Sequence, residues 1–502
     1  MEASPNARVE LRVGDLIRRN AEAVPGRVAA SLGEAVLTHA GLEAAASRIA
    51  VALRERGAAR GERVLAFADT SLETLALFAA TSKAGLVFAP LDARLSEGEA
   101  RVLAEVARPH WVVADASRLD AAATAARAVG ASPLELGRLG AAPRPDALLA
   151  ERTASGCPDD GALREADPHV MFFTSGSTGR PKAVVLSHRA SYLRSFQGVF
   201  RDVPEISVCM FPLFHMAGFT LALSAWQTRG EIALVAQPTA DALLEAIAQR
   251  RGTRLYGIPS IWHRILAADL SRYDVSSLRE LDTGTSATPL ELIQALKARF
   301  PGTATRIYYG STEAGSAATL PDVDVLRKPG SVGLPSPGVE LRLADDGEIC
   351  VRSAYLMDGY FEDAAATAEA LRDGWFHTGD LGELDLEGYL HVTGRKKDVI
   401  RTGGESVTPA EVEAALARHP RVAEVAVVGV PDVQWGEVVC AVVVPAGSAP
   451  TLVELQRHCE GELAPFKRPR RLELVDALPR TAATGQVQRA LLVQRLVAPA
   501  RA

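Results

Sequence analysis

The sequence predicts an α/β protein with a large N-terminal domain of doubly wound sheets plus a β subdomain, and a small α+β C-terminal domain hinged to it. Three observations predict this fold. Helical and strand patterns alternate through residues 13–281, short strands and turns replace that alternation from residue 330, and a charged segment without apolar residues, 394–398, precedes a compact α+β stretch. The length of 502 residues is also too great for one typical core.

The first alternating region contains helices and strands in turn. Apolar residues at helical spacing predict helices, and short apolar runs predict strands. The predicted helices are 13–20, 42–56 and 72–84, and the predicted strands are 63–67, 87–90, 111–113 and 170–173. This order favours a largely parallel sheet. The stretch 121–163 is rich in Ala, Pro, Gly and Arg and poor in aromatic residues, which predicts a variable surface excursion.

The second alternating region covers residues 207–281, and the pattern changes after it. The predicted strands of this region are 208–211, 232–236 and 254–257, and those of the β subdomain are 339–343, 347–352 and 389–393. Beyond the charged segment, helices are predicted at 409–418 and 452–463, and strands at 422–430 and 438–444. We therefore expect a large domain at 1–394, a hinge at 395–398 and a small mobile domain at 399–502.

Composition excludes several classes of protein. The formal charge of −6 is small for this length and argues against nucleic acid as the main partner. The five cysteines are scattered without a C-x-x-C pair, which indicates a reducing compartment and no metal cluster. No signal-peptide pattern and no apolar run of about 18 residues occurs. We expect a cytoplasmic protein without integral membrane association, and the sequence leaves its oligomeric state open.

The segment Thr174-Ser-Gly-Ser-Thr-Gly-Arg-Pro-Lys182 is a candidate phosphate-binding loop. Its glycines let backbone N–H groups approach a phosphate, and its hydroxyl groups and lysine supply further donors. The order of a Walker A loop is absent. Taken alone, the segment fits phosphate binding and an ordinary surface turn equally well.

Three further segments carry residues suited to a magnesium nucleotide. Tyr308-Tyr-Gly-Ser-Thr-Glu313 ends a predicted strand with a hydroxyl and a carboxylate, which suit a Mg²⁺ that also touches phosphates. Trp375-Phe-His-Thr-Gly-Asp380 places an aspartate after a glycine turn, where it can accept from two ribose hydroxyls. Gly394-Arg395 places a guanidinium at the domain break. Each alone has a structural explanation: Tyr309 as a core residue and Asp380 as a turn residue.

In this order and at these separations, the segments resemble the adenylate-forming superfamily of acyl- and aryl-CoA synthetases, peptide-synthetase adenylation domains and beetle luciferases. The resemblance extends over residues 16–492 and is strongest to bacterial acyl- and aryl-CoA synthetases. It implies a ligase that uses ATP and Mg²⁺ to convert an organic acid into an acyl- or aryl-adenylate, with release of pyrophosphate. Coenzyme A then attacks the adenylate, giving a thioester and AMP.

The resemblance also implies roles for individual residues. The implied nucleotide-binding residues are Thr174, Ser175, Gly176, Ser177, Thr178, Gly179, Lys182, Thr285, Ser286, Ala287, Tyr309, Gly310, Ser311, Thr312, Asp380 and Arg395. The implied catalytic residues are Thr178, Lys182, His215, Glu313 and Gln486, with Glu313 as the metal ligand. The implied substrate pocket contains His215, Met216, Phe219, Trp262, Gly284 and Tyr309. Lys397 matches the hinge position, and Gly403, Gly404 and Glu405 match the coenzyme A tunnel.

One position departs from the family pattern. The C-terminal segment normally ends in Pro-Arg-Thr-x-x-Gly-Lys, and its lysine bridges the acid and the α-phosphate, whereas Gln486 stands there in this chain with one extra residue before the Thr-Gly. The glutamine is engineered, or another cation such as Lys467 or Lys182 serves, or the acid needs no such bridge, or the first half-reaction is lost, or the change is neutral.

Three functions follow from these alternatives. The first is an acid:CoA ligase for an apolar or aromatic acid, because Met216, Phe219, Ile258 and Ile261 near the predicted pocket are apolar. The second is a diazotase that activates nitrite with ATP and transfers it to an aryl amine, since a small inorganic acid does not need the lysine. The third is a catalytically impaired relative that binds the adenylate. Which acid is activated, and whether the acceptor is coenzyme A, an amine or a carrier protein, stays open.

Overall fold

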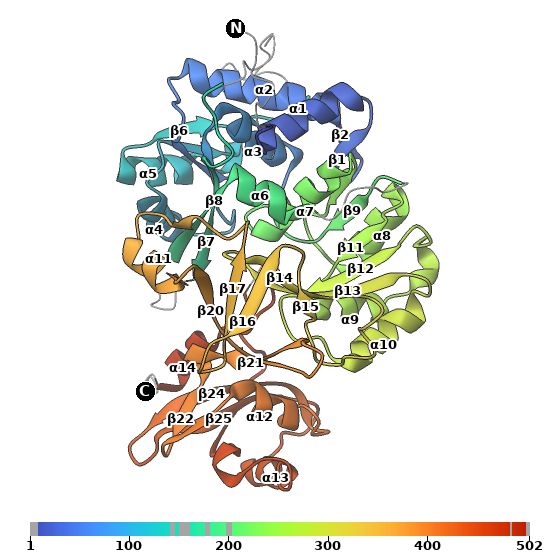
Figure 1. Ribbon diagram of the computed structural model, residues 1–502, viewed down its shortest axis with the longest axis vertical. Coiled ribbons are helices and arrows are strands. Elements are labelled where there is room, and N and C mark those ends of the chain that lie inside the picture. The colour runs from blue at the N-terminus through green and yellow to red at the C-terminus, as the bar shows by residue number, and fades with distance from the viewer. Residues whose placement is uncertain are drawn as a thin grey trace.

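The computed structural model describes residues 9–140, 146–149, 161–175, 181–196, 203–481 and 484–497. Figure 1 shows a large body that carries the N-terminus and a small body that carries the C-terminus, with strands β16, β17, β20 and β21 between them. The large body contains two mixed sheets. This arrangement confirms the predicted fold class, in which helices cover parallel strands and a separate small domain follows.

The sheet that presents the candidate phosphate loop has the strand order β18-β8-β7-β4-β3-β5-β6. Its strands are β3 (Arg63–Phe67), β4 (Val87–Pro90), β5 (Trp111–Ala114), β6 (Ser132–Glu135), β7 (Pro168–Ser175), β8 (Pro181–Ser187) and β18 (Gly359–Tyr360). Strands β3 to β7 are parallel neighbours, and β8 and β18 are antiparallel additions at one edge. Strand β7 therefore ends beside the antiparallel edge, where the loop begins.

This sheet is buried on both faces. In β3, Val64 and Ala66 pack into one core cluster, whereas Leu65 and Phe67 pack into another. A strand that is covered on both sides is apolar at every position rather than at alternate ones, which is why the sequence shows a continuous run here. Helices α4 (Glu97–Ala107) and α5 (Leu119–Val129) cover one face. Helices α1 (Val13–Ala23), α2 (His39–Glu55), α3 (Leu72–Ala84) and α6 (His188–Arg194) belong to the other cluster.

The second sheet has the order β15-β14-β13-β12-β11-β9-β10-β1-β2. Its strands are β1 (Val28–Leu32), β2 (Ala35–Thr38), β9 (Ile206–Cys209), β10 (Glu231–Leu234), β11 (Arg254–Tyr256), β12 (Glu280–Gly284), β13 (Ala304–Ser311), β14 (Gly315–Leu320) and β15 (Leu334–Pro335). The helices between them are α7 (Met216–Gln227), α8 (Ala240–Arg250), α9 (Pro259–Ala267) and α10 (Leu290–Arg299). The parallel strands β11, β12 and β13 end at one edge, so the residues that follow them lie close together.

A smaller antiparallel sheet connects the large body to the small one. It has the order β16-β17-β20-β19, with β21 paired to β20. Its elements are β16 (Val339–Leu343), β17 (Glu348–Ser353), β19 (Leu371–Arg372), β20 (Trp375–Leu384), β21 (Leu390–Arg395) and, beside it, helix α11 (Ala364–Ala370). The register pairs Asp380 with Arg395 across β20 and β21. Two segments that were identified separately in the sequence therefore meet here.

The small body is a sheet with helices on both faces. Its strands have the order β23-β22-β25-β24, with β26 paired to β25. The elements are β22 (Ile400–Thr402), β23 (Glu405–Val407), α12 (Pro409–Leu416), β24 (Val422–Asp432), β25 (Gly436–Pro445), α13 (Leu452–His458), β26 (Arg471–Leu474) and α14 (Arg489–Val497). Successive residues of β24, such as Val427 and Val428, point to opposite faces of the sheet and belong to different core clusters. The residue limits of the predicted hinge, 395–398, stay a prediction.

One prediction about the fold is wrong. The stretch 121–163 begins as ordered structure rather than as a surface excursion, because α5 packs Ala122, Ala125 and Ala126 against the core, and β6 adds a parallel edge strand to β5. Alanine leaves little apolar periodicity to detect, yet its small side chain lets helices α4 and α5 approach closely. Residues 141–145 and 150–160 of this stretch lie outside the described part of the chain.

Candidate active site

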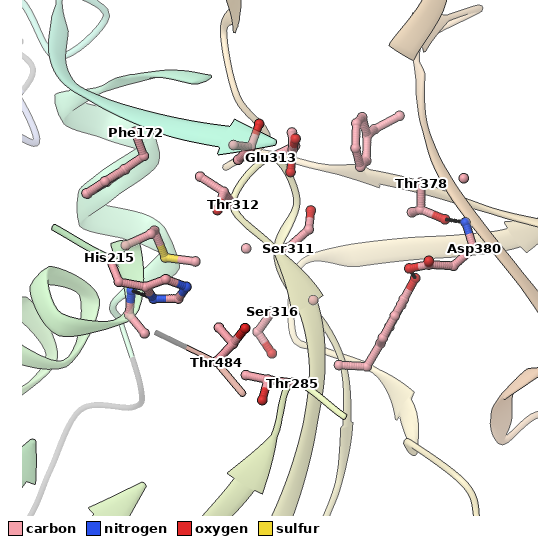
Figure 2. A pocket seen from close by; sticks show the side chains of 18 of the residues that line it. Phe172, His215, Thr285, Ser311, Thr312, Glu313, Ser316, Thr378, Asp380 and Thr484 are labelled. Carbon is pink, nitrogen blue, oxygen red and sulfur yellow. Dashed lines mark hydrogen bonds between the residues drawn. The ribbon is translucent and has the colours of Figure 1, made fainter. Parts of the chain in front are cut away.

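A cavity of about 820 Å³ lies where the three sheets of residues 9–395 meet the C-terminal segment. Its walls come from β7, β8, α7, β13, β20 and β21, together with Thr481, Thr484 and Gln486 of the small body. Figure 2 shows His215 on one side of this cavity and Asp380 on the opposite side, with Ser311, Thr312 and Glu313 between them. The volume is in the range of a small-molecule site.

The strand ends around the candidate phosphate loop face this cavity. Thr174 and Lys182 are opposite each other in the β7–β8 pair, and both line the cavity. The ammonium nitrogen of Lys182 lies 4.7 Å from the centre of the Tyr360 ring. Gly176, Ser177, Thr178 and Gly179 lie outside the described residues, as does the side chain of Ser175. Their predicted contacts with phosphate stay predictions.

The segment after β13 forms the middle of the cavity. Gly310 has no room for a side chain, because a Cβ atom there would lie 1.9 Å from the carbonyl oxygen of Gly315. Ser311 accepts a hydrogen bond from the backbone of Ala314, which closes the turn that carries Thr312 and Glu313. The hydroxyl group of Tyr360 donates to the carboxylate of Glu313 at 3.2 Å. Lys182, Tyr360 and Glu313 are therefore linked in a row along one wall.

The opposite end carries a buried carboxylate. Asp380 is 9% exposed, accepts a hydrogen bond from the hydroxyl of Tyr309 at 2.8 Å, and pairs with Arg395 at 3.0 Å. Burial raises the pKa of Asp380 above its usual value, and the neighbouring Arg395 opposes that rise. The predicted partners Asp380, Tyr309 and Arg395 thus lie together and face the same cavity as Glu313.

His215 caps the first turn of α7. Its Nδ1 accepts a hydrogen bond from the backbone of Ala217 at 3.2 Å, so in the neutral ring the proton is on Nε2. Burial lowers the pKa of His215 to about 4, so the imidazole is neutral at pH 7. His215 and Met216 both line the cavity, and their predicted contact with substrate stays a prediction.

The end of β12 is strained and contacts the small body. Thr285 has a φ of +66°, which is uncommon for a β-branched residue and typical of functional positions. Its carbonyl accepts a hydrogen bond from the side-chain amide of Gln486 at 2.7 Å, across 201 residues of sequence. Gln486 therefore reaches the cavity. Ser286 and Ala287, which follow Thr285, are exposed and do not line the cavity.

Three residues predicted in the substrate pocket lie elsewhere. Trp262 is fully buried and donates its indole N–H to the carbonyl of Asp282. Phe219 packs against Phe78 and Phe88 in the aromatic core. A Cβ atom on Gly284 would lie 2.3 Å from the carbonyl oxygen of Tyr308, so this glycine allows close strand packing instead of lining the cavity. The pattern of apolar residues does not tell which face of an element meets the cavity.

The structure also adds residues that sequence reasoning missed. Arg194, at the end of α6, lines the cavity and donates to the carbonyl groups of Thr312 and Tyr355. Glu348 accepts from the backbone of Gly379 and pairs with Lys396, which holds the turn before Asp380. Helix α6 has the sequence His-Arg-Ala-Ser-Tyr-Leu-Arg, which is polar enough that nothing in the sequence pattern singles out Arg194.

The remaining predicted residues belong to the small body and the connection to it. Lys397 lines the cavity, whereas Gly403 and Gly404 in the β22–β23 turn and Glu405 at the start of β23 do not. Both glycines have positive φ, and Trp435 packs against Gly403. Lys467, considered as a substitute cation, pairs with Glu411 at 2.5 Å and does not line the cavity. Their hinge and tunnel roles stay predictions.

The wall around Glu313 fits a magnesium ion that is mainly coordinated by substrate. No group of three or more His, Cys, Asp or Glu that could hold a metal occurs in the described ranges. Mg²⁺ is commonly bound through one or two carboxylates, with phosphate oxygens and water as the other ligands. Glu313, which follows Thr312 and is linked to Lys182 through Tyr360, offers such a single carboxylate.

Comparison with known families identifies the chain. The family model described as "AMP-binding enzyme" matches residues 17–361, and the model of the AMP-binding enzyme C-terminal domain matches residues 411–484. The chain belongs to the AMP-binding enzyme family. Indoleacetate–CoA ligase from Aromatoleum aromaticum is 36% identical over 95% of this chain and 97% of its own length. Feruloyl-CoA synthase from an Amycolatopsis species is 35% identical over 94% of this chain and 97% of its own length.

Solved structures of this adenylate-forming family are also similar. ATP-bound MatB from Rhodopseudomonas palustris has a TM-score of 0.85 and 31% identity, over 96% of this chain and 98% of that one. The amide bond synthetase McbA from Marinactinospora thermotolerans has a TM-score of 0.85 and 30% identity, over 96% and 99% of the two chains. The o-succinylbenzoate coenzyme A synthetase of Bacillus subtilis, solved with ATP and magnesium ion, has a TM-score of 0.84 and 26% identity, over 95% and 98%.

These findings confirm that the protein is a ligase of the AMP-forming acyl-CoA synthetase type, as the motifs predicted. The described part of the chain contains no helix of sufficient length and apolarity to span a bilayer.

Proposed function

We propose that this AMP-binding enzyme activates an apolar or aromatic carboxylic acid with ATP and transfers the acyl group to coenzyme A. The observation that carries the proposal is the single cavity shared by Glu313, Asp380 and Arg395, which come from three separate segments. Separate cavities for these residues would have contradicted a common nucleotide site. The apolar wall of the cavity, formed by Phe172, Phe211, Met216, Ala217 and Leu221, fits an apolar acid.

In this proposal the nucleotide lies in the cavity with its ribose at Asp380 and its phosphates at Lys182. Asp380 is placed to accept hydrogen bonds from the ribose hydroxyls, with Tyr309 and Arg395 beside it. The triphosphate then extends past Thr312 and Glu313 toward Thr174 and Lys182. A magnesium ion held by Glu313 would neutralise phosphate charge when bound. The acid lies near neutral His215, whose Nε2–H can donate to a carboxylate oxygen.

The chemistry follows from this placement. The acid carboxylate attacks the α-phosphorus of ATP, and the bond to pyrophosphate breaks. Lys182 supplies positive charge at the phosphate end, where negative charge accumulates. The thiolate of coenzyme A then attacks the acyl carbonyl, and AMP leaves. Lys397, at the predicted hinge, lies at the edge of the cavity, so a rotation of the small domain there would remove Gln486 from the cavity between the two steps.

The proposal is tested by measuring AMP and pyrophosphate release with a panel of aryl and fatty acids, with and without coenzyme A. We expect both products to require an acid and ATP, and a thioester to form only with coenzyme A. The absence of adenylate and thioester with every acid would refute the proposal. An acid that gives adenylate but no thioester would point to an amine or a carrier protein as acceptor.

A second candidate is activation of nitrite for transfer to an aryl amine, and Gln486 is the observation that favours it. A glutamine amide bonded to the Thr285 carbonyl brings no cation to the substrate. Nitrite is a much smaller acid than an aryl or fatty acid, and it does not need a lysine to hold a carboxylate against the α-phosphate. Nitrite-dependent AMP release in the presence of an aromatic amine, with no response to organic acids, would favour this candidate over the CoA ligase.

A further inference from the structure

A second, much smaller cavity adjoins the main one. It has a volume of about 10 Å³, the space of a single water molecule or hydroxyl group. Phe172, Arg194, Met216 and Thr220 line both cavities, so these four residues are the shared wall. Met216 has an unbranched, flexible side chain that can adopt other rotamers, and its sulfur accepts a hydrogen bond from the hydroxyl of Thr220. We refer to the smaller space as the side cavity.

Most of the lining of the side cavity is apolar, but four polar side chains interrupt it. The apolar residues are Phe78, Val170, Phe172, Leu186, Met216, Phe219 and Leu223. The polar residues are Thr220, whose hydroxyl donates to the sulfur of Met216, and His169, Ser191 and Arg194, which are 0%, 3% and 6% exposed. Within the described residues, His169 Nε2, Ser191 Oγ and Arg194 Nε have no hydrogen-bond partner. A buried polar atom without a partner is destabilising, so three of them around one space indicate a place for a polar ligand group.

The hydrogen-bond directions at this space can be assigned. The hydroxyl of Ser82 donates to the carbonyl of Phe78 at 2.8 Å, so its oxygen accepts from Nδ1–H of His169 at 3.2 Å. His169 Nε2 is therefore a free acceptor. Arg194 uses its two terminal nitrogens on the carbonyls of Thr312 and Tyr355, which leaves Nε–H as a free donor. Ser191 can donate or accept.

A hydroxyl group matches this set of partners. It can donate to His169 Nε2 while it accepts from Arg194 Nε–H or Ser191. A methoxy or carbonyl oxygen accepts only, so it leaves the histidine acceptor unsatisfied. A carboxylate is too large for a space of about 10 Å³ and has no proton to donate.

We propose that the side cavity binds a hydroxyl group of the acid substrate, so that Ser191, His169 and Arg194 select hydroxylated acids over their unsubstituted parents. The inference rests on the proposed function, because the acid must occupy the main cavity to reach the shared wall. Recognition is coupled to the nucleotide site, since Arg194 also holds the carbonyl of Thr312. Ser191, His169 and Arg194 are specificity residues in this proposal and take no part in bond making.

The test compares arylacetic and cinnamic acids that differ only in one ring hydroxyl at the ortho, meta or para position, together with the matching methoxy acids. Turnover is measured as kcat/KM for AMP release, and binding of the same acids is measured by calorimetry in the presence of AMP. We expect one hydroxyl isomer to exceed its parent acid by about tenfold, and the methoxy acid to lose that advantage.

Ser191→Ala is expected to reduce the ratio of kcat/KM for the hydroxyl acid to kcat/KM for the parent acid about tenfold. The kcat/KM for the parent acid itself should change less than about twofold. Ser224→Ala is the matched control, because Ser224 is also a buried serine on a neighbouring helix, and its hydroxyl lacks a described partner, but it does not line the side cavity. The control should leave the preference unchanged.

Equal kcat/KM and equal affinity for every hydroxyl isomer and its parent would overturn the proposal and leave the side cavity as the site of an ordered water. A preference that is unaltered in Ser191→Ala would also overturn it. The proposed function fails separately, through absence of AMP release with all acids, and in that case the binding series alone decides the role of the side cavity.

Discussion

Replacing Gln486 with lysine is the perturbation that tests the active site most directly. The side-chain amide of Gln486 lies in the cavity and donates to the carbonyl of Thr285 at 2.7 Å. That carbonyl follows strand β12, next to the cavity wall where the acid and the α-phosphate are proposed to meet. A lysine there would keep a donor for the carbonyl and add a positive charge.

The magnitude follows from the charge. Two opposite unit charges about 4 Å apart attract by about 4 kcal/mol at an effective dielectric constant of about 20. Part of this is lost in desolvating the lysine, which leaves about 2–3 kcal/mol in the transition state. We therefore expect Gln486→Lys to speed adenylate formation by about 30- to 150-fold.

The assay is single-turnover formation of the acyl-adenylate with a good acid substrate, which separates the first step from thioester formation. Gln488→Lys is the matched control, because it adds the same charge at an exposed glutamine two residues away that does not line the cavity. Gln486→Ala reports the contribution of the amide itself, about 1 kcal/mol. A rate for Gln486→Lys that is unchanged or lower than the wild-type rate would refute the reasoning and show that glutamine suits the native acid.

Three further predictions concern the rest of the site. Asp380→Asn should raise the KM for ATP about tenfold or more with a smaller effect on the KM for the acid, because two bonds to a charged carboxylate are weakened. Since burial raises the pKa of Asp380, ATP affinity should fall as the pH is lowered through that raised pKa, and the variant should lose this dependence. Burial lowers the pKa of His215 to about 4, so His215 should not titrate near pH 6.5. The pH profile of kcat/KM for the acid should therefore have the same shape near pH 6.5 in the wild type and in His215→Ala. Arg254→Met should lower the free energy of unfolding by about 3 kcal/mol, because Asp282 would lose its 2.5 Å partner and keep only the 3.7 Å pair with Arg306. The exposed pair of Arg251 with Asp274 is the control, since Arg251→Met should cost less than about 1 kcal/mol in the same thermal unfolding measurement.

Elements that depend on local physics are the ones whose limits the amino-acid sequence predicts best. The apolar runs of β3 and β4 have the residue limits that the sequence predicted, because strands buried on both faces are apolar throughout. The segment around Gly310 and Glu313 could be recognised because close backbone approach requires glycine at one defined position. These features depend on a few neighbouring residues and therefore leave a readable pattern.

The sequence by itself determined the fold class, the order of the two domains and several of the segments that meet at the cavity. Only the tertiary structure decided which side chains line the cavity. It moved Trp262 and Phe219 into the core, brought Arg194 to the wall, and joined Gln486 to a strained Thr285 from a segment 201 residues away. The physical reason is that periodicity reports whether a residue is buried, whereas the packing of distant elements decides what it is buried against.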